Sequence, residues 1–90
     1  EVQTIGVKAR LLHVLMIFYE RYGHLDPEVG HVFDIPVARR DLAALVGAAP
    51  ETISRTTRQL EEDGLVQFRG VRQAIIPNLD LVFEEIGTDI

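Results

Sequence analysis

The chain has 90 residues, of which 47% are hydrophobic and 26% charged, and it contains no cysteine. This length and composition predict one globular domain with a modest core, and they exclude disulfides and thiolate metal sites in these residues. No apolar run reaches the roughly 18 residues that a membrane-spanning helix needs, and residues 1–10 lack the order of a secretory signal. We therefore expect a cytoplasmic protein that does not act in a membrane. Because the sequence starts at Glu1 rather than methionine, we also expect a fragment of a longer protein.

The formal net charge of −5 argues against a nucleic-acid partner when it is taken alone. The charges are unevenly distributed, however. Six of the nine Lys and Arg residues lie between positions 39 and 72 together with five acids, whereas the rest of the chain carries three basic and nine acidic residues. Such asymmetry matters more than the total for a nucleic-acid binding surface. The distribution therefore permits DNA binding by residues 39–72 without establishing it.

The first expected element is a helix over Val7–Tyr22, because its apolar residues recur at three- and four-residue spacing. We expect Gly23 to end this helix in a left-handed conformation. Residues 24–30 are rich in turn-forming types and are expected to form a loop. His31–Pro36 is expected to form a short strand that the proline closes.

Two helices joined by a tight bend are expected next, over about Arg39–Val46 and from Pro50 to about Asp63. Gly47 begins the connection because glycine adopts positive φ at little cost, and proline suits the first position of a helix. The residues expected to face the core are Leu42, Leu45 and Val46 in the first helix, and Ile53, Thr57 and Leu60 in the second. The small Ala43 and Ala44 are expected to leave room where the second helix crosses the first.

A hairpin and a last helix are expected to complete the domain. Residues 65–68 and 73–77 are predicted strands on either side of the basic turn Arg69-Gly70-Val71-Arg72. Asn78 is expected to cap a helix over Leu79–Ile86, which Gly87 ends. This order predicts an α+β, mainly α, winged helix-turn-helix: a three-helix core, a small antiparallel β-hairpin wing and a short C-terminal helix. The helix-turn-helix falls at about 39–62 and the wing at about 65–76.

Polar residues at i, i+3, i+4 and i+7 share one face of the third helix, opposite its apolar side: Glu51, Ser54, Arg55 and Arg58. A recognition helix places such a stripe in the major groove, where arginine pairs with guanine and glutamate accepts from cytosine. The plainer alternative is a solvated face braced by a Glu51–Arg55 ion pair. We favour base contact because an acid precedes several hydroxyl and guanidinium donors on this helix.

Three runs make a more specific resemblance: R-R-D-L-A-A-L-V-G from Arg39, P-E-T-I-S-R from Pro50 and L-E-E-D-G-L-V from Leu60. They resemble the C-terminal domain of the Crp/Fnr superfamily of bacterial transcription regulators, and the similarity extends over roughly Val7 to Leu81. The resemblance implies sequence-specific binding of double-stranded DNA by a homodimer. It also implies an inverted repeat with TTGA-like half-sites, because position 54 holds the serine of the Fnr-like branch.

The resemblance assigns roles to individual residues. The implied base-reading residues are Glu51, Ser54 and Arg55. The implied phosphate or backbone contacts are Arg40, Thr52 and Arg58, together with Arg69 and Arg72 of the wing. Gly70 matches the family's turn glycine, whereas Val71 stands where the cyclic-AMP receptor branch has a basic residue; its two arginine neighbours are expected to replace that contact.

The resemblance also implies what lies outside this domain. Residues 1–6 correspond to the hinge that follows an N-terminal sensor barrel and dimerisation helix. Any effector, whether a cyclic nucleotide, haem, an iron–sulfur cluster or another ligand, is expected to bind that sensor, so no cofactor is expected in residues 7–90. RNA polymerase is an expected partner of the whole regulator.

Other functions have weaker support. The spacing of His13, His24 and His31 fits no common metal site, and the consecutive acids Glu61, Glu62 and Asp63 point in different directions on a helix. No Gly-rich phosphate cradle or nucleophile–base set occurs, so an enzyme is not expected. The remaining alternative is a winged-helix protein–protein interaction module without DNA readout, which the acidic net charge would suit. Salt dependence of duplex binding discriminates the two, because only phosphate contact releases counterions.

Overall fold

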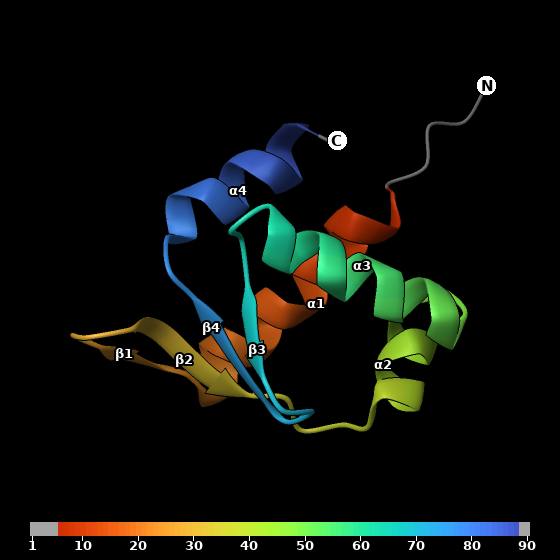
Figure 1. The fold of residues 1–90 in the computed structure, drawn as a ribbon, viewed down its shortest axis with the longest axis horizontal. Helices are drawn as coiled ribbons and strands as arrows, with labels where there is room; N and C mark the ends of the chain where they lie inside the picture. Colours follow the sequence, from red (N-terminus) through yellow and green to blue (C-terminus); the bar gives the residue numbers. More distant parts are fainter. Residues whose placement is uncertain (1–5, 89–90) are drawn as a thin grey trace.

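The computed structural model describes residues 6–88, in which helices pack beside a small antiparallel sheet (Figure 1). The elements, in chain order, are α1 Val7–Tyr22, β1 His24–Asp26, β2 Gly30–Asp34, α2 Arg39–Val46, α3 Pro50–Glu62, β3 Gln67–Arg69, β4 Gln73–Ile76 and α4 Leu79–Thr88. This order and arrangement confirm the predicted winged helix-turn-helix. The expected hinge at residues 1–6 lies, apart from Gly6, outside the described residues. None of the helices within residues 6–88 has the length and hydropathy required to span a bilayer.

The core is one cluster to which every helix and both central strands contribute. The side chains that are nearly or completely buried include Leu11, Leu12, Leu15, Phe33, Ile35, Leu42, Ile53, Leu60, Val66, Ile76 and Val82. Helix α1 has the predicted bounds and supplies three of them from one face, as its three- and four-residue spacing requires. The core therefore fixes α2 and α3 against α1, which passes behind α3 in Figure 1.

The predicted left-handed conformation at Gly23 is wrong. Its backbone is extended, with φ −98° and ψ 170°, and its N–H donates to the Tyr19 carbonyl at 2.7 Å. Glycine is needed here for a different reason: a Cβ would lie 2.2 Å from Cδ1 of the Tyr19 ring and 2.6 Å from the Tyr19 carbonyl oxygen. Glycine is therefore required at position 23 because the Tyr19 ring and carbonyl lie so close to the backbone, and not because of its φ angle.

The loop predicted at residues 24–30 is only partly right: residues 27–29 form a turn, but His24–Asp26 form β1 and Gly30 begins β2, and these two strands pair. Asp26 Oδ1 accepts from the Glu28 N–H at 2.8 Å, which forms the turn between the two strands. The sheet order is β1-β2-β4-β3, so β1 and β2 extend the predicted wing hairpin into a four-stranded antiparallel sheet. Because β1 is short and largely exposed, it lacks the alternation that would have identified it in sequence.

The bend between α2 and α3 forms as predicted. Gly47 adopts φ +79° and ψ 38°, and two hydrogen bonds close the end of α2: the Ala48 N–H donates to the Ala43 carbonyl at 3.0 Å and the Gly47 N–H to the Ala44 carbonyl at 3.2 Å. These are the bonds of a Schellman motif. Arg10 of α1 satisfies a further terminal carbonyl, since its Nε donates to the Val46 oxygen at 2.9 Å. The bend is thus held locally and from α1.

One predicted core residue of α2 faces solvent. Leu45 is 58% exposed, while Leu42, Ala43 and Val46 are buried and Ala44 is exposed. Each helical residue advances about 100°, so the three buried residues span an arc of about 100° whose centre lies about 110° from Leu45. The prediction of Leu45 was therefore wrong because an eight-residue helix buries a narrow face, and Ala43 rather than Leu45 lies on it.

Helix α3 ends at Glu62, one residue before the predicted end, and Gly64 follows with φ +74°. The first wing strand was predicted at residues 65–68, but β3 covers Gln67–Arg69, so Arg69 ends the strand instead of beginning the turn. The second, β4, ends at Ile76, one residue before the predicted end, and Gly70 lies in the turn with φ +65°. Asn78 caps α4 as predicted, because its Oδ1 accepts from the Asp80 N–H at 2.9 Å. The predicted end at Gly87 is wrong, since α4 continues to Thr88.

An ion-pair cluster joins three helices. Lys8 Nζ, in the first turn of α1, lies 2.6 Å from Asp63 Oδ2 at the end of α3 and 3.4 Å from Glu85 Oε2 on α4. Gln59 Nε2 also donates to Asp63 at 3.0 Å. The hydrogen bonds from Lys8, and then Gln59, lower the pKa of Asp63 below its ordinary 3.8, and the bond to Asp63 raises the pKa of Lys8 above its ordinary 10.5.

These shifts predict how stability depends on pH. The contribution of Asp63 is complete above its ordinary pKa and is lost as pH falls through the lowered one; that of Lys8 is lost only as pH rises through its raised pKa. We expect Asp63→Asn to lower the urea midpoint slightly at about pH 7, because the pair is exposed, and the difference to vanish by about pH 2. In a Lys8→Met background the same substitution should have little effect. A difference that is constant across this pH range would contradict the prediction.

Candidate nucleic-acid interface

The predicted polar stripe lies on the exposed face of α3. Its four residues are all exposed: Glu51, Ser54, Arg55 and Arg58. On the opposite face Ile53 is 1% exposed, Thr57 7% and Leu60 0%, which confirms all three predicted core residues of this helix. Because the apolar face of α3 packs in the core, the helix cannot rotate about its axis, and the polar face points to solvent.

Two threonine hydroxyls bond back to the α3 backbone. Thr57 Oγ1 donates to the Ser54 carbonyl at 2.9 Å and Thr56 Oγ1 to the Thr52 carbonyl at 2.7 Å. The buried hydroxyl of Thr57 is thereby satisfied inside the helix. The Ser54 hydroxyl, by contrast, makes no hydrogen bond to another residue within residues 6–88 and is exposed, so it is free to contact a partner molecule.

The ion pair considered between Glu51 and Arg55 does not form. Arg55 Nη2 instead donates to Thr52 Oγ1 at the long distance of 3.4 Å, and neither Glu51 nor Arg55 forms an ion pair with another residue in the described part of the chain. An intrahelical contact of this length is weak and easily exchanged. The plainer interpretation of the stripe, a solvated face stabilised by a Glu51–Arg55 ion pair, therefore lacks that ion pair.

The wing presents the second group of predicted site residues. The turn residues Arg69, Gly70, Val71 and Arg72 are all exposed, and Figure 1 shows the turn at the lower edge of the molecule. The base of the turn is anchored because the Ile35 N–H donates to the Arg72 carbonyl at 2.6 Å. Arg40 is exposed in the first turn of α2, and Thr52 is partly buried on α3. The predicted residues thus lie on three elements, at α2, α3 and the β3–β4 turn.

Sequence reasoning missed Arg39. Its guanidinium carbon lies 5.0 Å from the centroid of the Phe68 ring, which joins α2 to β3. The only signal in the sequence was the doublet Arg39-Arg40, in which the second residue drew attention because it matched a family position. A contact between residues so far apart in the chain leaves no local pattern.

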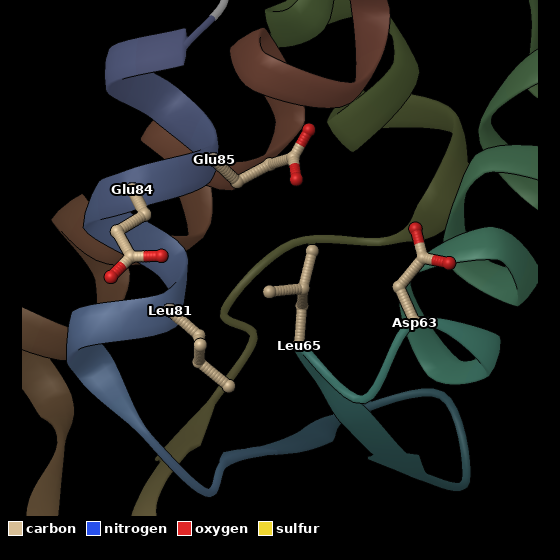
Figure 2. A pocket seen from close by; sticks show the side chains of 5 residues that line it. All are labelled: Asp63, Leu65, Leu81, Glu84 and Glu85. Atoms are coloured by element: carbon tan, nitrogen blue, oxygen red, sulfur yellow. The ribbon is translucent and has the colours of Figure 1, made fainter.

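A shallow pocket at the other end of α3 has the wrong charge for DNA. Figure 2 shows Leu65 between Asp63, at the end of α3, and the carboxylates of Glu84 and Glu85 on α4, with Leu81 beside them. The pocket lies about 18 Å along the helix from Glu51, at 1.5 Å per residue. Lys8 neutralises part of this charge through its ion pairs with Asp63 and Glu85, but the three carboxylates still outnumber it, so the pocket is a poor site for phosphate. Within residues 6–88 no cluster of three or more potential metal ligands occurs.

Two helices joined at a left-handed glycine, an exposed polar stripe on the second of them, and a hairpin with an arginine on each side of its turn define a winged helix-turn-helix DNA-binding domain. The family model described as the Crp-like helix-turn-helix domain matches residues 9–81. The chain therefore belongs to this family, as its sequence motifs predicted. The family is a DNA-binding fold of transcription regulators and not an enzyme.

Individual relatives agree with this assignment. The transcriptional activator protein FnrL of Cereibacter sphaeroides is 35% identical over 57 residues, which are 63% of this chain and 23% of that protein. A probable transcriptional activator of Rhizobium leguminosarum bv. viciae is 30% identical over 74 residues, or 80% of this chain and 28% of that protein. A mutant of CooA from Carboxydothermus hydrogenoformans has a TM-score of 0.81 at 17% identity, covering 90% of this chain and 37% of that one. The chain spans about a quarter of the length of these curated relatives.

Proposed function

We propose that this domain reads DNA sequence for a dimeric transcription regulator. Each of two copies inserts α3 into the major groove at one half of an inverted repeat with TTGA-like half-sites. Two-fold symmetry of the protein matches that of the site, and the two α3 helices enter successive major grooves about 34–36 Å apart. The observation that carries the proposal is the exposed stripe on α3, whose Glu51 and Arg58 side chains make no hydrogen bond or ion pair within the described residues.

The stripe divides into base readers and backbone contacts. Arg55 donates two hydrogen bonds to guanine O6 and N7, and Glu51 accepts from the amino group of cytosine. Ser54, between them on the same face, selects the outer base of the half-site. These three lie in the first half of α3, which is the part of a recognition helix that reaches base edges.

The remaining predicted residues anchor phosphates. Thr52 and Arg58 flank the base readers on α3, Arg40 lies at the start of α2, and Arg69 and Arg72 lie on either side of the wing turn. Such contacts set the position of the protein on the duplex but carry no sequence information. Specificity and general affinity are therefore assigned to different side chains.

The rest of the regulator supplies the other activities. Because the relatives are about four times longer than this chain, we assign dimerisation and effector binding to regions upstream of it. The effector class, whether cyclic nucleotide, haem, iron–sulfur cluster or another ligand, is a property of that region. RNA polymerase is the proposed partner through which DNA binding alters transcription.

Salt dependence tests the proposal. The affinity of the chain for duplex should fall linearly on a plot of log K against log salt, because each phosphate contact releases about 0.9 counterions. Replacing Arg69 and Arg72 together with alanine should weaken binding to all sequences alike and reduce the slope by about 2. The control is Arg21→Ala, which removes an exposed charge from the end of α1, away from the proposed interface.

Two outcomes would contradict the proposal in different ways. An unchanged slope in the wing variant would remove Arg69 and Arg72 from the phosphate contacts while leaving α3 as the reader. Absence of any salt dependence, or of any binding at low salt, would favour the protein–protein interaction module instead.

A further inference from the structure

Phe68 in β3 is tied to both helices of the helix-turn-helix. Its ring lies under the Arg39 guanidinium, 5.0 Å from centroid to Cζ, at the start of α2. Its backbone N–H donates to Glu61 Oε2 on α3 at 3.2 Å. One wing residue is thus held by α2 through its side chain and by α3 through its main chain.

The sheet makes these contacts important for the wing. The strand order is β1-β2-β4-β3, so β4 is held on both sides whereas β3 is an edge strand paired with β4 alone. Three residues form β3, and the ladder joins it to the sheet along that one side. The position of β3 relative to the recognition helix therefore depends on contacts outside the ladder. Phe68 packs against the core, and Arg39 and Glu61 contact it from α2 and α3.

Two features of the position of Arg39 are energetically unfavourable. It begins α2, where the helix dipole disfavours a cation, and its Nε is buried without a hydrogen-bond partner within residues 6–88. Contact of the guanidinium with an aromatic ring offsets part of this cost. Arginine is a good helix former, so the cost is electrostatic, and the contact with Phe68 is what compensates it.

We propose that Arg39 is a positioning residue: by stacking on Phe68 it fixes the β3–β4 hairpin against α2 and α3, and so sets the wing's contribution to DNA affinity. The DNA part of this inference rests on the proposed function. Its physical basis is the short reach of a charged hydrogen bond to phosphate, about 2.7–2.9 Å, so a hairpin displaced by an ångström or so loses the contact.

The first test uses the free chain. Arg39→Ala retains α2 because alanine is a good helix former, and Phe68→Leu retains an apolar side chain but not the ring. Both should speed amide hydrogen exchange in β3, residues 67–69, at least tenfold while leaving exchange in α1 and α3 within about twofold of the parent. Arg39→Lys keeps a cation over the ring and should restore most of the protection. Unchanged exchange in β3 of Arg39→Ala and Phe68→Leu would overturn the proposal.

The second test is a double-mutant cycle on duplex binding. Arg39→Ala should weaken binding several-fold in the parent chain, but by less than twofold when Arg69 and Arg72 are already alanine, because Arg39 then has no wing contact to position. An equal loss in both backgrounds would show that Arg39 acts on DNA directly and would overturn its positioning role.

The two proposals fail separately. If the wing variant alone leaves affinity and salt slope unchanged, the wing's phosphate role is wrong and the DNA part of this inference falls with it. The exchange measurement does not involve DNA, so faster exchange in β3 of Arg39→Ala would still support the inference that the Arg39–Phe68 contact holds β3 in place.

Discussion

Arg55→Ala is expected to weaken binding to the preferred duplex by about 1–3 kcal/mol and to relax the preference at one base pair. The arginine lies on the exposed face of α3, one turn after Glu51, and within the described residues its guanidinium makes only the 3.4 Å hydrogen bond to Thr52. Little is therefore lost inside the domain when its guanidinium turns to a base. The measurement is an unbiased selection of bound duplexes, followed by titration of the selected and of random sequences.

Arg58→Ala is the matched control for this experiment. It removes the same charge from the same face of α3, one turn further along, where we assign a backbone contact. It should weaken binding to selected and random duplexes by similar factors and leave base preference unchanged. If Arg55→Ala also weakens both alike, its base-reading role is wrong, and Arg55 is one more phosphate contact.

Ile53→Ala is expected to lower the free energy of unfolding by about 2–5 kcal/mol, the range for removing a buried isoleucine side chain. Ile53 is 1% exposed and lies in the core on the inner face of α3, directly before Ser54. In a domain of this size such a loss is a large fraction of the total stability. Urea denaturation with linear extrapolation measures it, and Ile53→Val should cost only about 0.5–1.5 kcal/mol.

Leu45→Ala is the control for the core assignment. The leucine is apolar and helical but 58% exposed, so its replacement should change stability by no more than about 0.5 kcal/mol. A loss comparable to that of Ile53→Ala would mean that Leu45 is covered in the folded chain. A small effect of Ile53→Ala would in turn mean that α3 is not held as described, and the outward direction of its polar stripe would lose its support.

Local rules predicted the helices well. The bounds of α1 and α2 are those predicted, and α3 differs by one residue at its end, because apolar spacing and a terminal glycine or proline act within one or two turns of the chain. Gly47 shows the same locality: its positive φ follows from a bend that the neighbouring residues close by their own hydrogen bonds. The stripe on α3 was predictable for this reason, since a helix with a known buried face has a known exposed one.

Local rules failed where neighbours in space decide the conformation. Residues 24–26 become a strand only because β2 lies beside them, and Gly23 is glycine because the Tyr19 ring occupies the place of a Cβ. Arg55 has two acceptors within one turn, Glu51 and Thr52, and its guanidinium contacts the second. All three outcomes concern contacts that periodicity does not encode.

Residues close together in the chain were enough to predict the helix-turn-helix, the exposed residues on its second helix and the family. The four-stranded sheet, the exposure of Leu45 and the contact of Arg39 with Phe68 became apparent only in the folded domain. Strand pairing and ring contacts join residues far apart in sequence, so their partners are defined only once the core has brought the elements together.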